Sequence, residues 1–121
     1  MHQIGALLYL AWGLLHLQAA HRVYRLGGSQ PPGMVRGRLL QNAWNLAYFA
    51  VFVVVVAVAL NWQNSLLGYW LNLITASVTD FGFIIFILAP RYLPPWPGWL
   101  GPILWILAAL FSTLGVLAGA A

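Results

Sequence analysis

The chain contains no cysteine, no lysine and no glutamate, and among its 121 residues there is a single acidic side chain, Asp80. Without cysteine it can form no disulfide, no cysteine-ligated zinc site and no iron–sulfur cluster. One carboxylate within a chain cannot provide the pair of carboxylates that many hydrolases use as acid and base. These absences exclude several classes of enzyme and metalloprotein.

Charged residues of either sign are scarce, because they make up 5% of the chain while hydrophobic residues make up 63%. A soluble domain has about 25% charged residues, so this chain cannot build a water-facing surface. Long apolar runs such as 49–60 lack polar alternation and favour helices over a transmembrane barrel. The composition therefore predicts an all-α integral membrane protein. The net charge of +4 has no soluble basic face to occupy, so we expect no nucleic-acid partner.

The apolar pattern predicts a single transmembrane domain over residues 1–121, built as a bundle of four transmembrane helices. Each span has about the 20 residues that a bilayer requires. The predicted spans are about 4–24, 39–60, 66–88 and 99–118. Glycine and proline gather in 25–38, and proline in 89–98, so both segments are predicted as loops.

The basic residues all fall in or beside these two loops, which share one side of a four-span bundle: Arg22, Arg25, Arg36, Arg38 and Arg91. The positive-inside rule makes this side cytoplasmic, so both termini are predicted on the non-cytoplasmic side. We expect the location to be the bacterial inner (plasma) membrane. The arginines serve orientation or bind anionic lipid head groups, which makes membrane lipids the expected partners.

Polar side chains are predicted to form one layer inside the bundle. At about 1.5 Å per residue, His16 in the first span and Asn45 in the second reach a depth similar to that of Asp80 in the third. Helical periodicity places Asn72 and Thr79 on the same face as Asp80. The candidate residues for binding a ligand or a proton are Asp80, His16, Asn45, Tyr48, Asn72 and Thr79.

A carboxylate at this depth costs at least about 2.5–3.5 kcal/mol on insertion scales, so Asp80 needs a compensating partner. Three alternatives remain open from the sequence. The partner is a protonated His16, or an arginine that reaches up from the cytoplasmic end, either Arg22 or Arg38. Otherwise Asp80 is protonated and hydrogen-bonded to Asn45 or Tyr48.

Small residues recur on the helix faces that carry the polar side chains, and they predict close helix packing. In the first span these are Ala6, Gly13 and Ala20, and in the fourth they are Ala108, Ser112, Gly115 and Gly119. The last two glycines form a GxxxG pattern, which joins spans within one chain or joins two chains. A homodimer or another membrane-protein partner therefore remains open.

We expect no cofactor and no metal. A haem held within one chain needs two axial histidines on facing helices, but His16 and His21 point apart on one helix and His2 lies at the opposite membrane face. The polar layer offers one histidine and one carboxylate, which do not make a metal site.

The leading hypothesis is a non-enzymatic membrane protein that binds a small amphipathic ligand, or handles a proton, at the layer around Asp80, His16 and Asn45. The rival is an accessory or interaction subunit of a larger membrane complex, in which the layer only fixes packing. A third alternative is an isomerase that uses Asp80 and His16 as acid and base on a lipid substrate.

Overall fold

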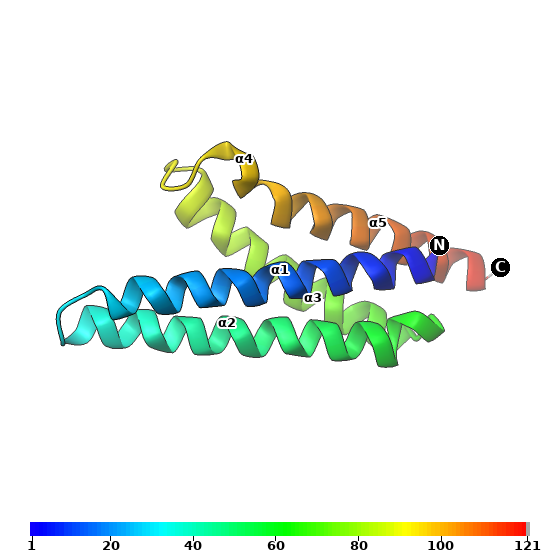
Figure 1. Ribbon diagram of the computed structural model, residues 1–121. Helices are drawn as coiled ribbons and strands as arrows, with labels where there is room; N and C mark the ends of the chain where they lie inside the picture. The colour runs from blue at the N-terminus through cyan, green and yellow to red at the C-terminus, as the bar shows by residue number, and fades with distance from the viewer. Residues whose placement is uncertain (121) are drawn as a thin grey trace.

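The computed structural model describes residues 1–120 and is helical wherever these residues form regular structure (Figure 1). The elements are α1 (His2–Gly28), α2 (Met34–Ala59), η1 (Asn61–Gln63), α3 (Leu66–Phe83), η2 (Ile84–Leu88), α4 (Pro95–Gly98) and α5 (Leu100–Ala120). Four helical segments are long and apolar enough to cross a membrane: His2–Gly28, Met34–Gln63, Leu66–Leu88 and Leu100–Gly119. The prediction of four apolar helices is confirmed.

The first predicted loop, 25–38, is wrong in its extent. The helix α1 continues to Gly28 and α2 begins at Met34, which leaves only Ser29–Gly33 between them. The polar residues after residue 24 end the apolar stretch but do not end the helix, whereas the consecutive prolines Pro31 and Pro32 cannot continue it. Gly33 then turns the chain with a φ of 151°, a backbone conformation that favours glycine. The other predicted loop, 89–98, contains the short helix α4.

The helix α1 packs antiparallel against α5 through glycines. A Cβ atom added at Gly5 would lie 2.9 Å from the backbone nitrogen of Ser112, and one at Gly101 would lie 3.2 Å from the His16 ring. These contacts set the register of the pair. Because α5 begins at Leu100, the part of α1 that comes after His16 soon runs beyond the end of α5.

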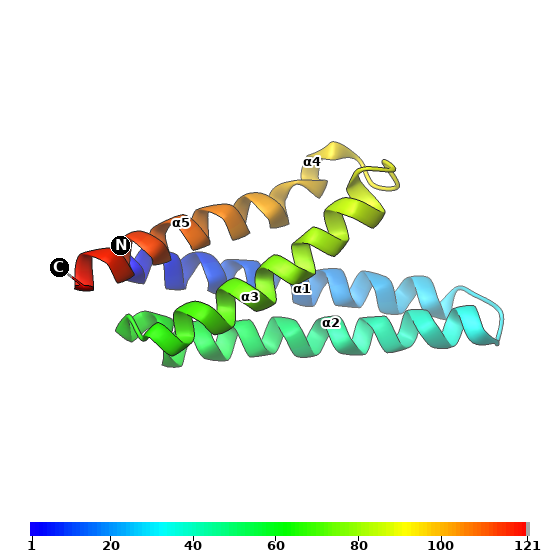
Figure 2. The same cartoon turned by 180° about the vertical axis from the view of Figure 1, so that it is seen from behind.

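The helices α1 and α2 form a long antiparallel hairpin. Gly13 lies against the Ala50 carbonyl oxygen, and Gly27 lies against Leu39 and Leu40. Figures 1 and 2 show the loop end of this hairpin extending past the ends of α3 and α5. We call residues 18–48 the projecting hairpin, since α1 has no α5 beside it over this length. It extends by about 15 Å at 1.5 Å per residue.

The GxxxG glycines of α5 pack within the chain. Gly115 lies against the backbone of His2, and Gly119 lies beside the Asn64 side chain, whose Nδ2 donates a 3.0 Å hydrogen bond to the Gly115 carbonyl oxygen. Small residues therefore bring the end of α5 onto the start of α1. In this structure the pattern is used inside one bundle.

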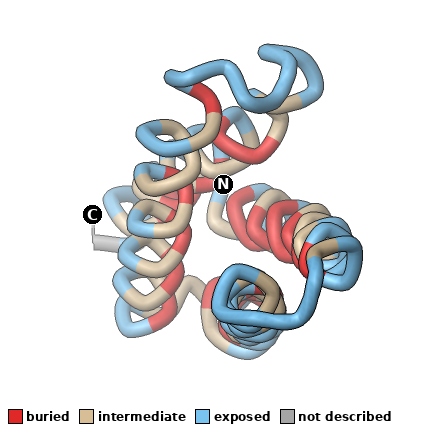
Figure 3. Tube along the Cα trace, turned by 90° about the vertical axis from the view of Figure 1, so that its left-hand side faces the viewer, coloured by how far each residue is buried: buried red, intermediate tan, exposed pale blue. Residues whose placement is uncertain are grey.

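The buried faces of the helices turn toward the middle of the bundle, as the view along the helices shows (Figure 3). The core residues are Tyr9, Trp12, Val53, Ala57, Ala76 and Ala108. Large apolar side chains such as Val55, Phe81 and Ile106 are more than half exposed on the outside. A surface of this kind suits lipid and does not suit water.

Candidate functional site

Asp80 lies on the inner face of α3 and is fully buried, with 0% of its surface exposed. Two side chains of α1 meet its carboxyl group. The indole Nε1 of Trp12 donates a 2.8 Å hydrogen bond to Oδ2, and Nε2 of His16 lies 3.3 Å from Oδ1. Of the three alternatives for the partner of Asp80, the structure brings His16 to it. We call Trp12, His16 and Asp80 the buried triad.

The His16 ring is held from three sides. Its Nδ1 lies 2.7 Å from the carbonyl oxygen of Trp12, one helical turn earlier. The ring stacks on the Trp12 indole, with 3.7 Å between ring centroids and 22° between planes. On α5, Gly101 faces the ring, and a Cβ atom added there would lie only 3.2 Å from it. These contacts aim Nε2 at Asp80.

The hydrogen bonds restrict where protons sit in the buried triad. A carbonyl oxygen can only accept, so the contact requires that Nδ1 of His16 carry a hydrogen, which donates a hydrogen bond to the Trp12 carbonyl oxygen. Oδ2 of Asp80 accepts the indole proton of Trp12. The contact between Oδ1 and Nε2 is stable only with one further proton between these two atoms, because otherwise a carboxylate would face a nitrogen lone pair.

A proton shared between these two atoms would make the His16–Asp80 pair electrically neutral. With the proton on oxygen the pair is a carboxylic acid and an imidazole, and with the proton on nitrogen it is a carboxylate and an imidazolium. Either arrangement avoids an isolated charge in a buried site, which would be very costly. Within residues 1–120, Oδ1 has no other polar partner.

Two residues predicted for this layer are elsewhere, so that part of the prediction is wrong. Asn45 is exposed on α2 and Tyr48 is 63% exposed, whereas Ala43 and Ala50 occupy the buried face of the same helix. The prediction counted the depth of Asn45 from residue 39, which it took as the start of the span. The helix α2 begins at Met34 instead, and its first part belongs to the projecting hairpin. Neither side chain can hydrogen-bond to Asp80.

The arginine alternative is also wrong. Arg22 is exposed on the projecting hairpin, and Arg38 donates a 2.9 Å hydrogen bond to the neutral Gln41 side chain on its own helix. In the described part of the chain, His16 is the only basic side chain within 4.0 Å of the Asp80 carboxyl group.

Asn72 and Thr79 lie on α3 but take no part in the buried triad. Asn72 is fully buried about 12 Å farther along the helix axis, where its Nδ2 donates to the Val53 carbonyl oxygen at 3.1 Å and to Asn61 Oδ1 at 2.8 Å. Thr79 donates to the Thr75 carbonyl oxygen at 2.8 Å. Asn72 therefore links α3 to α2 and η1, whereas the hydrogen bond of Thr79 stays within α3.

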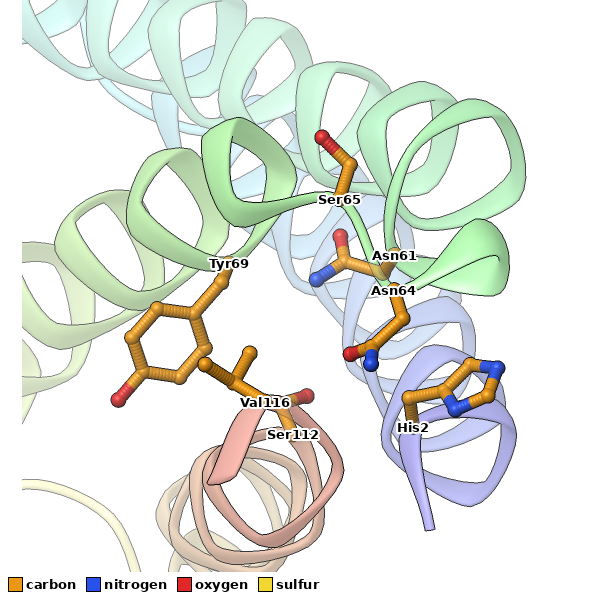
Figure 4. Close-up of a pocket in the computed structure, with 7 residues that line it drawn as sticks. All are labelled: His2, Asn61, Asn64, Ser65, Tyr69, Ser112 and Val116. Atoms are coloured by element: carbon orange, nitrogen blue, oxygen red, sulfur yellow. The ribbon is translucent and has the colours of Figure 1, made fainter. Parts of the chain in front are cut away.

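A shallow hollow lies at the end of the bundle that carries the N-terminus (Figure 4). Its lining residues are His2, Asn61, Asn64, Ser65, Tyr69, Ser112 and Val116. The interior volume is close to 0 Å³, so even a water molecule does not fit. Polar contacts such as the 2.9 Å bond between Tyr69 and Thr113 instead join α3 to α5 at this end.

A second hollow of about 220 Å³ lies on the outside, lined by Phe49, Ile74, Thr75, Val78 and Thr79. Its lining residues come from α2 and α3. Neither hollow is lined by a residue of the buried triad. Neither of these two hollows therefore gives access to the buried triad.

Trp12 is the member of the site that the sequence interpretation missed. A signal for it was present, since an indole N–H buried in an apolar environment needs an acceptor. Trp12 also lies four residues before His16, on the same helix face. With one carboxylate in the chain, Asp80 was the strongest acceptor available to it.

Comparison with known proteins adds no relative. The chain matches no protein family, no curated protein and no solved structure. Within residues 1–120, no group of three or more metal-ligating side chains comes together. The function must therefore be argued from the geometry of the buried triad.

Proposed function

We propose that this chain is an integral membrane protein that holds an exchangeable proton on the Asp80–His16 pair. The observation that carries the proposal is the geometry around that pair. Nδ1 of His16 and Oδ2 of Asp80 are both engaged by Trp12, so the remaining proton position lies between Oδ1 and Nε2, 3.3 Å apart. An acid and an imidazole in contact inside a membrane are the usual parts of a proton relay.

Burial favours a proton over a small amphipathic ligand. Asp80 is 0% exposed and His16 is 7% exposed, and neither of the two hollows described above is lined by either residue. A ligand needs a cavity that encloses most of its surface, whereas a proton needs only a donor and an acceptor. The same burial argues against a lipid isomerase, because a substrate carbon cannot reach either group in this conformation.

The rival function is that of an accessory subunit, in which the buried triad only joins α1 to α3. The hydrogen bond from Trp12 to Asp80 does join these helices across 68 residues of sequence. Such a tie is worth about 0.6 kcal/mol on average in a membrane protein. The two functions predict different proton fluxes for a variant that lacks the acid but keeps the hydrogen bonds.

The test is proton flux into liposomes that contain the purified protein and a pH-sensitive dye. Asp80→Asn still accepts from Trp12 and can donate to Nε2 of His16, but it holds no exchangeable acid proton. We expect the wild type to dissipate an imposed pH gradient faster than empty liposomes do, and Asp80→Asn to match empty liposomes. Asn45→Leu is the matched control, because it removes an exposed amide and should keep the wild-type rate.

Wild-type flux in a folded Asp80→Asn variant would show that the pair is structural and would favour the accessory subunit. Infrared spectroscopy provides an independent check, because Asp80 is the only acidic side chain. A carboxylic-acid carbonyl band that Asp80→Asn removes reports the proton on oxygen. His16 labelled with ¹⁵N reports the proton on nitrogen.

A further inference from the structure

The projecting hairpin concentrates positive charge at one end of the molecule. Arg22 and Arg25 lie one turn apart on α1 and are both exposed. Across the loop on α2, Arg38 is exposed and Arg36 is half-buried. Four of the five arginines of the chain therefore lie within a short length of one helical hairpin.

These arginines have no carboxylate within the described chain to balance them. The only acidic side chain is Asp80, which is buried among Trp12 and His16. Arg38 contacts a neutral amide. Like charges at this spacing repel one another, so an anion from outside the chain would stabilise the hairpin.

Large apolar side chains are exposed among the same arginines. Tyr24 is 60% exposed, Leu26 52%, Met34 73% and Val35 66%. A partner in water would leave these side chains in contact with solvent. At the boundary of a bilayer they would enter the apolar edge while the guanidinium groups reach the phosphates. The mixture of charge and apolar surface therefore fits a lipid partner better than an acidic protein.

The hairpin also lies at a suitable depth. The proline-rich segment at this end of the bundle carries exposed aromatic residues, Tyr92 and Trp96 among them, which are typical of the membrane interface. Arg22 and Arg25 lie about 9 and 13 Å beyond His16 along α1. Their side chains are long enough to meet phosphates in the head-group layer on this side.

We propose that the projecting hairpin binds anionic phospholipid head groups through Arg22 and Arg25, with Arg36 and Arg38 adding charge from the facing helix. The guanidinium group is planar and holds a phosphate through two parallel hydrogen bonds. Lipid binding here is independent of the proton proposed for Asp80, since the two sites share no residue.

The test uses the full chain in nanodiscs of phosphatidylcholine mixed with phosphatidylglycerol. Native mass spectrometry of the protein released in mild detergent then counts the lipids that stay bound. We expect the wild type to retain phosphatidylglycerol in preference to phosphatidylcholine, and added salt to weaken that preference. Arg22→Gln and Arg25→Gln should each lower it about fivefold. Circular dichroism checks that each variant remains helical.

Arg91→Gln is the matched control, because it removes the same charge outside the hairpin. It should lower the preference less than either hairpin variant does. The double variant Arg22→Lys/Arg25→Lys keeps the charge and should retain part of the preference. A wild type that retains both lipids equally overturns the proposal. So does an Arg91→Gln effect as large as that of the hairpin variants, because the preference would then depend on net charge alone.

Discussion

Asp80 shows how a single acid can be placed in the interior of a membrane protein. Its carboxyl group accepts a hydrogen bond from the Trp12 indole, and Nε2 of His16 lies 3.3 Å from its other oxygen. A proton shared by Asp80 and His16, as we propose, would make the pair neutral and avoid the cost of an isolated charge, which is about 2.5–3.5 kcal/mol even on insertion scales. Asp80 could be singled out in the sequence because it is the only acidic side chain. Its contacts with Trp12 and His16 explain how the bundle accommodates it.

Trp12→Phe should lower the free energy of unfolding by about 1–2 kcal/mol. Phenylalanine keeps the stack on His16 but removes the N–H that serves Oδ2, so a fully buried oxygen loses its partner. The measurement is unfolding in mixed detergent micelles. Trp105→Phe is the control, because it removes a similar indole bond to Ser77 in a half-buried position. It should cost about 0.5 kcal/mol, and an equal cost for both variants would contradict the special role of Trp12.

At the scale of the elements, α1 is the helix on which the bundle is assembled. Its glycines bring α2 against one side and α5 against another, and its aromatic and histidine side chains reach α3. Close approach of the α1 and α5 backbones is what places Gly101 behind the His16 ring. The small-residue faces therefore position the buried triad as well as the helices.

Gly13→Ala should destabilise the protein by about 1–3 kcal/mol. The added methyl group would meet the Val54 side chain and lie 2.9 Å from the Ala50 carbonyl oxygen, so α1 and α2 would have to separate. Gly82→Ala makes the same change where the space within 4 Å is open. It should be neutral or stabilising by up to about 1 kcal/mol, because alanine favours the helix. Equal loss of stability in the two variants would count against close packing at Gly13.

At the scale of the whole molecule, the four apolar helices place the arginine-rich hairpin and the α4 segment at one end and both termini at the other (Figure 1). The positive-inside rule predicts that the arginine-rich end is cytoplasmic. The bacterial inner membrane, a homodimer and a membrane-protein partner remain predictions.

Reporter fusions test this orientation. Alkaline phosphatase joined to the C-terminus should be active, since that enzyme folds only outside the cytoplasm. A green fluorescent protein inserted between Ser29 and Gly33 should fluoresce, since it folds inside. The opposite pattern in both fusions would mean that the bundle is inverted. The anionic lipids proposed for the hairpin would then have to lie in the outer leaflet.

The all-helical fold and the four helices long and apolar enough to cross a membrane could be predicted from composition and hydropathy, because apolar content and helix length are properties of each segment separately. The burial of Asp80 and the nearness of His16 could also be predicted, because depth along a helix increases by a fixed rise per residue. The end of α1 could not. Hydropathy marks where the apolar stretch stops, while the α1 helix continues to Gly28.

Which polar residues meet depends on the packing of the four helices. Asn45 and Tyr48 belong to the predicted layer, but helix register and rotation turn them outward. Trp12 on α1 reaches Asp80 on α3 through its indole side chain, across 68 residues of sequence. Such contacts depend on how four helices rotate and slide against one another, and no single segment carries that information. Composition and hydropathy therefore predict lipid as the surroundings of the helices, whereas helix packing selects which polar residues form the buried triad.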